Sequence, residues 1–294
     1  MKICVLDIGG TAIKAGICEN GNLSALKEFP TEAKLGGAHV AARAQEIIEG
    51  YRREHAFSRI GISTAGQVNP VQGSIIWANE NIPGYTGMRL KDMMEEKFQL
   101  PTAVENDVNA AALGEAVFGA GRGMRDFACL TYGTGVGGAL FLGGKLYSGS
   151  SFSAGEFGAL VTHPEDRDPE KDFFSGCYEK YASATALVER ARALDESLSN
   201  GRLVFERKEE PEVAAVIDEW IGEIVYGLIT IIHMLNPGGI ILGGGVMEQP
   251  CVLEKIKERL YRNTIPSFRG VELKKAELGN RAGMLGASVL HEKR

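Results

Sequence analysis

The stretch from Cys4 to Leu23 reads CVLDIGGTAIKAGICENGNL, and the stretch from Cys129 to Leu146 reads CLTYGTGVGGALFLGGKL. In each, an apolar β-type run leads into a turn rich in glycine and threonine, and a second apolar run follows. Each stretch then ends in polar or glycine turn residues. A chance match between two β-hairpins is the simplest alternative. We interpret the similarity as an internal repeat, which predicts an α/β protein of two related halves that face a cleft.

A third stretch, Pro101 to Glu115, reads PTAVENDVNAAALGE. Its extended apolar start leads to Glu105, Asn106 and Asp107, and the alanine-rich remainder favours a helix. Polar side chains between a strand and a helix lie where open α/β sheets bind ligands. The ordinary alternative is that Asn106 or Asp107 only caps the helix. Asp107 is the candidate reactive group, whereas Glu105 has no predicted role.

Three glycine-rich turns each follow a predicted strand: Asp7 to Thr11, Gly133 to Gly138, and Gly243 to Gly245. Glycines let the backbone approach an anion closely and direct N–H groups at it. A carboxylate at Asp7 would repel a bare phosphate, so a divalent cation or its water shell should lie between them. None of the turns matches the GxxxxGK[ST] loop or the GxGxxG dinucleotide motif. Such glycines usually form ordinary turns, but three of them in two repeated halves predict phosphate binding.

The composition is that of an ordinary globular protein: 294 residues, 44% hydrophobic and 24% charged, enough for two domains. The net charge of -6 and the lack of a basic block argue against nucleic acid as the main partner. The five cysteines are scattered, which fits a reducing cytosol better than a disulfide framework. The N-terminal apolar run is too short for a signal peptide, and no run approaches the roughly 20 residues of a membrane span. We therefore expect a soluble cytoplasmic protein.

Residue patterns also predict the helices and the domain boundaries. Helices are expected over Ala41 to His55, Leu90 to Phe98, Cys177 to Ala193, Glu210 to Leu235, Leu253 to Leu260, and Ala282 to Lys293. We expect a smaller N-terminal domain over residues 1–118 and a larger one over 119–281. The small-residue helix of 282–294 is expected to pack back on the N-terminal domain.

The segments quoted above occur together with AGEFG (154–158), GCYEKYASATALV (176–188) and NPGGIILGGGV (236–246). In content and order they resemble the ROK family (repressors, open reading frames and kinases), within the actin/hexokinase-like superfamily. The resemblance covers nearly the whole chain. It implies two ribonuclease H-like α/β domains that face a central cleft. It also implies a kinase that transfers phosphate from Mg-ATP to a hydroxyl, expected to be O6, of a glucose-like hexose or hexoside.

The resemblance implies roles for individual residues, with Asp107 as the catalytic base on the attacked hydroxyl. The residues implied at the sugar are Asn106, Asp107, Glu156, Glu179, Gly66 and Asn81. The residues implied at ATP are Asp7, Gly9, Gly10, Thr11, Gly133, Thr134, Gly135, Gly244 and Gly245. Asp7 would hold Mg²⁺ through water or phosphate oxygens. A homodimer is also expected.

The chain departs from the family pattern at two places. Ala159 stands where the ExGH motif has its histidine, and Cys177 alone remains of the CxCGxxGC zinc run. Because a structural zinc needs four ligands such as three cysteines and a histidine, and His163 is shifted in position, no zinc is expected. A roomier, less polar anomeric end resembles the β-glucoside kinases. Glu179 instead resembles kinases of glucose or N-acylmannosamine, so all three substrates stay open.

Two alternatives belong to other functional classes. A ROK repressor would carry a winged helix ahead of the sugar domain, whereas Asp7 is here the seventh residue and the net charge is negative. A non-catalytic sugar-binding relative would share the same motifs without turnover. An ADP-release assay with ATP, Mg²⁺ and a sugar panel would distinguish both from a kinase.

Overall fold

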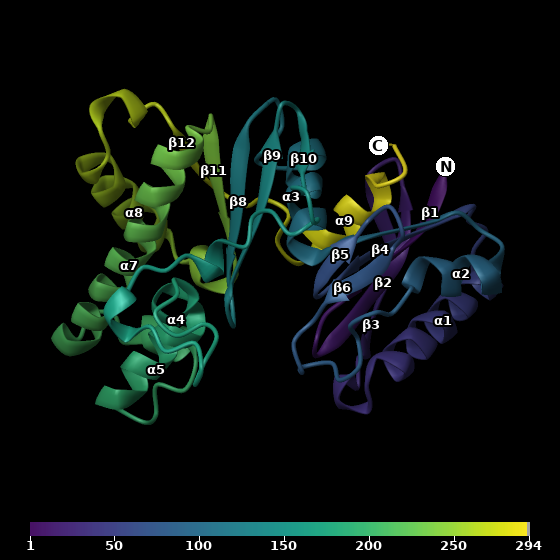
Figure 1. Cartoon of the computed structure of the whole chain (residues 1–294), viewed down its shortest axis with the longest axis horizontal. Coiled ribbons are helices and arrows are strands. Elements are labelled where there is room, and N and C mark those ends of the chain that lie inside the picture. Colours follow the sequence, from purple (N-terminus) through teal and green to yellow (C-terminus); the bar gives the residue numbers. More distant parts are fainter. Residues whose placement is uncertain (293–294) are drawn as a thin grey trace. The chain divides into compact units, whose positions relative to one another are not determined.

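The computed structural model describes residues 1–292 and shows an α/β protein with two five-stranded sheets (Figure 1). The chain divides into two compact units, which we describe separately. Unit 1 contains Met1–Gly123, Lys145–Ala154 and the chain from Glu277 onward. Unit 2 contains Met124–Gly144 and Gly155–Ala276.

The first sheet has the strand order β3-β2-β1-β4-β7. Its strands are β1 (Lys2–Ile8), β2 (Ala12–Glu19), β3 (Asn22–Pro30), β4 (Arg59–Thr64) and β7 (Thr102–Asn106). The first three form an antiparallel meander, and β4 and β7 run parallel to β1. A separate hairpin pairs β5 (Gln67–Asn69) with β6 (Ser74–Trp77).

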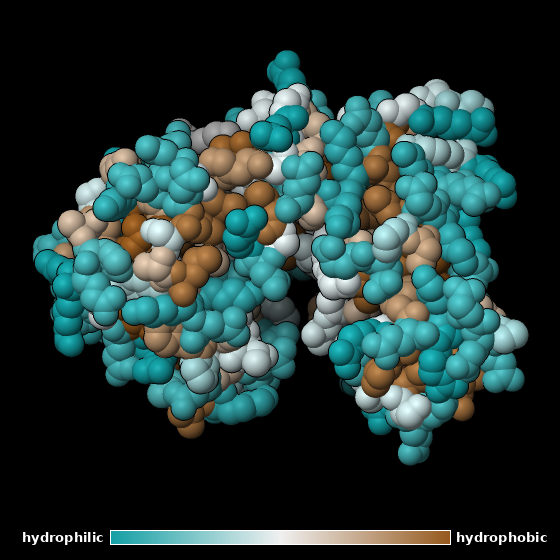
Figure 2. Space-filling model, turned by 180° about the vertical axis from the view of Figure 1, so that it is seen from behind, coloured by the Kyte–Doolittle hydropathy of each residue, from teal (hydrophilic) through white to brown (hydrophobic). Residues whose placement is uncertain are grey.

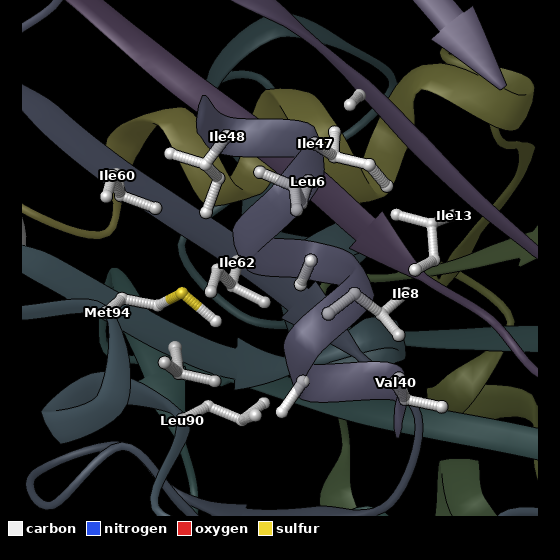
Figure 3. Close-up of a cluster of buried hydrophobic side chains, with 14 of the residues drawn as sticks. Leu6, Ile8, Ile13, Val40, Ile47, Ile48, Ile60, Ile62, Leu90 and Met94 are labelled. Carbon is white, nitrogen blue, oxygen red and sulfur yellow. The ribbon is translucent and has the colours of Figure 1, made fainter. Parts of the chain in front are cut away.

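Successive side chains along each strand point to opposite sides, so the first sheet has two faces. One face packs on α1 (Gly37–Glu54) and α2 (Leu90–Phe98) and forms a buried apolar core. Figure 3 shows this core, in which the labelled side chains are Leu6, Ile8, Ile13, Val40, Ile47, Ile48, Ile60, Ile62, Leu90 and Met94. Helix α1 contributes because its buried residues recur every three or four positions.

The second sheet has the order β10-β9-β8-β11-β12. Its strands are β8 (Phe127–Tyr132), β9 (Val136–Leu142), β10 (Lys145–Tyr147), β11 (Gly239–Gly243) and β12 (Glu272–Lys275). As in the first sheet, a central strand pairs antiparallel with the next strand in sequence and parallel with a later one, here β8 with β9 and β11. The shared topology confirms the repeat predicted from the two hairpin sequences.

The helices of unit 2 are α4 (Glu179–Ala182), α5 (Ala184–Leu194), α6 (Gly201–Glu206), α7 (Pro211–Leu235) and α8 (Pro250–Asn263). The single helix expected over Cys177 to Ala193 is wrong. Ser183 interrupts it with extended backbone angles (φ -67°, ψ 163°), and its side chain accepts a hydrogen bond from Ala186 N at 3.1 Å. Ser183 therefore ends α4 and caps α5.

The expected C-terminal helix is present as α9 (Ala282–Val289), and its expected last residues, Lys293 and Arg294, lie outside the described residues. Helix α9 packs on α3 (Asp107–Phe118) and on β1 and β4. Glycine permits the close approach of the two helices. A Cβ on Gly286 would lie 1.7 Å from Ala110 O, and one on Gly114 would lie 2.6 Å from Ala282 O.

We expect Gly286→Ala to destabilise the protein by about 2 kcal/mol or more, because the added methyl must separate two packed helices. Gly50→Ala is the matched control. Gly50 lies in α1, and a Cβ there would meet nothing within 4 Å, so helix propensity alone should stabilise that variant by up to about 1 kcal/mol. Urea unfolding of both variants measures the difference. Equal changes in the free energy of unfolding for Gly286→Ala and Gly50→Ala would contradict the packing argument.

The surface on the face drawn in Figure 2 is mainly hydrophilic, with smaller hydrophobic patches. Within residues 1–292, no helix combines the length and the hydropathy that a membrane span requires.

Candidate active site

In unit 1, the carboxyl ends of the parallel strands β1, β4 and β7 meet at one edge of the sheet. The strand register pairs Asp7 with Ser63 and Ser63 with Glu105, and Lys14 on β2 lies opposite Asp7. Residues paired across neighbouring strands project on the same face. The sheet therefore presents a row of four polar residues on the face opposite the apolar core.

Asp7 is held from two sides. Ser63 Oγ donates to Asp7 Oδ1 at 2.6 Å, and a Cβ on Gly283 of α9 would lie 2.8 Å from each of these oxygens. Burial raises the pKa of Asp7, and the Ser63 hydrogen bond and the charge of Lys14 lower it in part. Mg²⁺ favours one or two carboxylates together with water and substrate phosphates, so this donor set fits that ion.

The turn that follows β1 is fixed by Thr31, a fully buried residue. Thr31 Oγ1 donates to Gly9 O at 2.7 Å, and Thr31 N donates to Thr11 O at 3.0 Å. Gly10 and Thr11 are exposed at the tip of this turn. The tip can therefore present its backbone to an anion without a change in the strands.

Asn106 forms the junction between β7 and α3. Its Oδ1 accepts from the backbone N–H groups of Val108 and Asn109, at 3.0 Å each, so the capping interpretation is confirmed for this residue. Its Nδ2 donates to Gly66 O at 2.9 Å and to Asp107 Oδ1 at 2.8 Å. Asn106 therefore brings Gly66 and Asp107 together and orients the Asp107 carboxylate.

Asp107 is the first residue of α3, and its Oδ1 also accepts from Val108 N at 2.9 Å. Burial and, to a lesser extent, the nearby charge of Asp7 raise the pKa of Asp107 to about 6, although the hydrogen bonds from Val108 and Asn106 lower it in part. A carboxylate that titrates near neutral pH is suited to accept a proton from a substrate.

Glu105, for which the sequence suggests no role, is 4% exposed beneath this junction. Its Oε1 accepts from Asn106 N at 2.9 Å and from Asn109 Nδ2 at 3.2 Å. These bonds hold the backbone that carries Asn106 and Asp107. A glutamate directly after the apolar pair Ala103 and Val104 of a buried strand is the sequence signal, since acidic residues are seldom buried without partners.

Asn81 is placed differently from the other candidates of unit 1. It is exposed in the loop between β6 and α2, and its N–H donates to Asn79 Oδ1 at 3.2 Å. Among the hydrogen bonds of the described residues, none joins Asn81 to Asp107 or Asn106. The structure therefore brings together Asp7, Gly66, Asn106 and Asp107, and leaves Asn81 in a separate loop.

In unit 2, two glycine turns come from neighbouring parallel strands, because Thr131 at the end of β8 pairs with Gly243 at the end of β11. Gly133 N donates to Gly135 O at 3.0 Å and closes the first turn. Gly244 has φ 103°, and a Cβ there would lie 2.1 Å from Tyr132 O. Only glycine fits this second turn. The two turns thus present adjacent backbone segments at one edge of the sheet.

Glu179 lies at the start of α4, and its Oε2 accepts from Val136 N at 3.4 Å. A Cβ on Gly135 would lie 2.6 Å from this oxygen, and one on Gly158 would lie 3.0 Å from it. Burial raises the pKa of Glu179, and the bond from Val136 lowers it in part. The charge of Glu156, an exposed residue just before Gly158, raises it further. The structure therefore brings Glu156, Glu179 and the β8–β9 turn together.

Cys177 and His163 occupy ordinary structural environments. Cys177 is buried with a free thiol, and burial raises its pKa. The His163 ring stacks on Tyr181 with centroids 3.6 Å apart, and Nε2 lies 3.6 Å from Glu223 Oε2. Within residues 1–292, no three His, Cys, Asp or Glu side chains are grouped so that they could hold a metal ion.

Comparison with known proteins gives consistent matches over the whole chain. The model of the ROK family matches residues 3–294. The glucokinase of Streptomyces coelicolor is 35% identical, with 97% of this chain and 96% of that protein covered. The β-glucoside kinase of Listeria monocytogenes is 32% identical, with coverages of 98% and 96%. The crystal structure of a ROK family glucokinase from Streptomyces griseus with glucose and AMPPNP has a TM-score of 0.83 at 30% identity and covers 99% of each chain.

Proposed function

The chain belongs to the ROK family, and from this premise we propose that it is a kinase that transfers the γ-phosphoryl group of ATP to a sugar hydroxyl. The observation that carries the proposal is the Asn106–Asp107 junction, where a partly buried carboxylate with a pKa of about 6 is oriented by fixed hydrogen bonds. The glucokinases and β-glucoside kinases among the relatives support the same reaction type.

Asp107 would act as the base. The sugar hydroxyl oxygen forms a bond to the γ-phosphorus, the bond from that phosphorus to the bridging oxygen of ADP breaks, and the hydroxyl proton moves to Asp107. Because Asn106 and Val108 both donate to Oδ1, we propose that Oδ2 receives the proton. Asn106 keeps the carboxylate oriented, and its amide can reach a sugar hydroxyl by exchanging its bond to Gly66 O.

The phosphates of ATP would be held mainly by backbone groups. In unit 1 these belong to Gly9, Gly10 and Thr11, and in unit 2 to Gly133, Thr134 and Gly135, with Gly244 and Gly245 beside the nucleoside. Asp7 would hold Mg²⁺ together with phosphate oxygens, and the ion would supply neutralisation of phosphate charge. Lys14 adds a positive charge beside Asp7.

The sugar class is a glucose-like hexose or hexoside, with O6 as the proposed acceptor. Glu156 and Glu179 would bind hydroxyls toward the anomeric end, and Gly66 and Asn81 would line the other side. Ala159 removes an imidazole from the anomeric end, which favours substituents such as those of a β-glucoside. Glucose, a β-glucoside and N-acetylmannosamine are the three candidate substrates.

An ADP-release assay with ATP, Mg²⁺ and a panel of glucose, cellobiose, N-acetylmannosamine, fructose and allose tests the proposal. We expect sugar-dependent ADP release with at least one of the first three. Sugar binding without ADP release across the panel would instead support a non-catalytic sugar-binding protein or a repressor.

The pKa of Asp107 predicts the acid side of the pH profile. The base works as a carboxylate, so kcat/KM for the preferred sugar should be constant above about pH 7 and fall tenfold per pH unit well below about pH 6. Initial rates at saturating ATP between pH 5 and 8 measure the profile. The stability of the protein, followed by intrinsic fluorescence at each pH, is the control. A flat profile down to pH 5 would contradict the role of Asp107.

We also propose a cytoplasmic homodimer. The five free cysteines, four of them buried, support a reducing compartment. Tyr226 and Met234 on α7 are 60% and 72% exposed, and Ile265 beside His233 is 57% exposed. Large exposed apolar side chains on α7 and beside its C-terminal end support an interface there. Sedimentation velocity of the protein and of a Met234→Lys variant tests this assignment.

A further inference from the structure

The segment Val161–Cys177, here called the 161–177 loop, follows the short 3-10 helix Phe157–Ala159 and ends two residues before Glu179. Its two ends are held side by side. Val161 and Cys177 form an antiparallel bridge, and Tyr178 N donates to Leu160 O at 2.7 Å. The N–H groups of Thr162 and His163 both donate to Gly176 O, at 3.1 and 3.0 Å. The loop is therefore closed at its neck, directly beside α4.

Arg167 connects the outgoing half of the loop to the returning half. Its Nη1 donates to Phe173 O at 2.5 Å and to Ser175 O at 2.8 Å, and its guanidinium carbon lies 5.7 Å from the centre of the Phe173 ring. The neighbouring Asp168 N donates to Ser175 Oγ at 2.7 Å. Hydrogen bonds from a charged donor are about twice as strong as neutral ones. Arg167 thus bonds backbone carbonyls of the returning half of the loop to the outgoing half, and nearer the tip Lys171 adds an exposed ion pair with Asp168 at 2.7 Å.

The closed loop contacts the two residues that follow Glu179. Asp172 forms an ion pair with Lys180, with Oδ2 2.6 Å from Nζ. The His163 ring stacks on the Tyr181 ring, and Tyr181 Oη donates to Asp166. Helix α4 has only four residues, which is too short to be stable by itself. Its orientation therefore depends on its neighbours, which are the 161–177 loop at one end and, at the other, Trp220 of α7, whose Nε1 donates to Ala182 O at 2.9 Å.

Glu179 has little freedom once α4 is oriented. Its carboxylate lies against Gly135 of the β8–β9 turn and against Gly158, so a small rotation of α4 would displace it from both. A shift of about 1 Å takes a hydrogen-bond acceptor out of the usual donor–acceptor range, which weakens its bond to a substrate hydroxyl. The contacts between the loop and α4 therefore help to fix the position of the Glu179 carboxylate, which we propose binds the sugar.

We infer that Arg167 is a positioning residue that closes the 161–177 loop and through it holds Glu179 at the sugar site, by protein contacts alone. The sugar-binding part of this inference rests on the proposed function. The ordering of the loop and of α4 by Arg167 does not depend on it.

The test compares Arg167→Met, which keeps the side-chain length without its donors, with Arg167→Lys, which keeps the charge and can reach one carbonyl. For Arg167→Met we expect the KM of the preferred sugar to rise about tenfold, because the competent arrangement of Glu179 becomes a minor state. The KM of ATP should change by less than about twofold. Arg167→Lys should recover part of the loss. Arg202→Met is the matched control, since Arg202 is 79% exposed and pairs only with Glu206 among the described residues.

Hydrogen exchange without any substrate gives an independent readout. In Arg167→Met, the amides of Thr162, His163 and Tyr178 should exchange at least about tenfold faster, while those of α7 are unchanged. The wild-type protein should show the same slow exchange with and without EDTA, because the inference is that protein contacts, and not a bound metal ion, hold the loop. Unchanged exchange and an unchanged sugar KM would overturn the inference, as would faster exchange in EDTA or an equal rise in both KM values. If the wild-type protein phosphorylates no sugar, the proposed function fails, and exchange alone decides whether Arg167 orders α4.

Discussion

Replacing Asp107 with asparagine is expected to lower kcat for the preferred sugar by about 10²–10⁴ while the KM values for sugar and ATP stay within about twofold. Asparagine keeps an oxygen that can accept from Asn106 Nδ2 and Val108 N, so the local structure should persist. The amide cannot accept the hydroxyl proton. Steady-state kinetics at pH 7.5 measure the effect.

The same variant should be more stable than the wild type at neutral pH. Burial raises the pKa of Asp107 from 3.8 to about 6, so the folded protein binds this proton more tightly than the unfolded chain does. Stability from this group is therefore greatest below pH 3.8 and is lost as the pH rises through about 6. Two pKa units correspond to about 3 kcal/mol as an upper value, and we expect Asp107→Asn to gain about 1–3 kcal/mol at pH 7.

Asp92→Asn is the control for both measurements, because Asp92 is 49% exposed and pairs with Arg89 on the surface. It should change neither turnover nor stability. Urea unfolding at pH 7 should show the gain for Asp107→Asn alone, and unfolding at pH 4 should show it reduced. Turnover close to the wild-type value in Asp107→Asn would rule out Asp107 as the base.

The topology and the glycine turns were accessible from the sequence because they depend on local signals. The apolar runs and the turn residues after Ile8 and Tyr132 predict strands, their ends and the repeat. Asp107 was accessible for the same reason, since it directly follows a strand and begins a helix. The break at Ser183 was missed, although serine is a common capping residue, because the apolar periodicity continues across it.

The residues that support the site depend instead on contacts between distant segments. Ser63 bonds to Asp7 across 56 residues of chain, and Gly283 closes on the same pair from the C-terminal helix. Thr31 fixes the Gly9–Thr11 turn from the end of another strand. Strand register alone places Ser63 between Asp7 and Glu105, and register follows from the assembled sheet. No local sequence pattern predicts this register.

Glu115 on α3 is a further residue whose importance comes only from tertiary contacts. It is 1% exposed, and its two oxygens accept three backbone hydrogen bonds. Oε2 accepts from Ala120 N at 2.8 Å and from Glu277 N at 3.2 Å, and Oε1 accepts from Leu278 N at 2.9 Å. The carboxylate thus connects the end of α3 to the segment where the chain re-enters unit 1.

We expect Glu115→Ala to destabilise the protein by about 3 kcal/mol, because three backbone N–H groups lose a charged acceptor and water can reach only some of them. Glu115→Gln should cost about 1 kcal/mol, since an amide has one acceptor oxygen and must turn its NH₂ group toward at least one N–H donor. Glu46→Ala, on an exposed pair with Arg43, should change stability by less than about 0.5 kcal/mol. Urea unfolding of the three variants measures the free energy of unfolding of each and gives the order of the losses. If Glu115→Gln were as unstable as Glu115→Ala, loss of charge rather than loss of acceptors would explain the effect, and if both resembled Glu46→Ala, the carboxylate would not stabilise this junction.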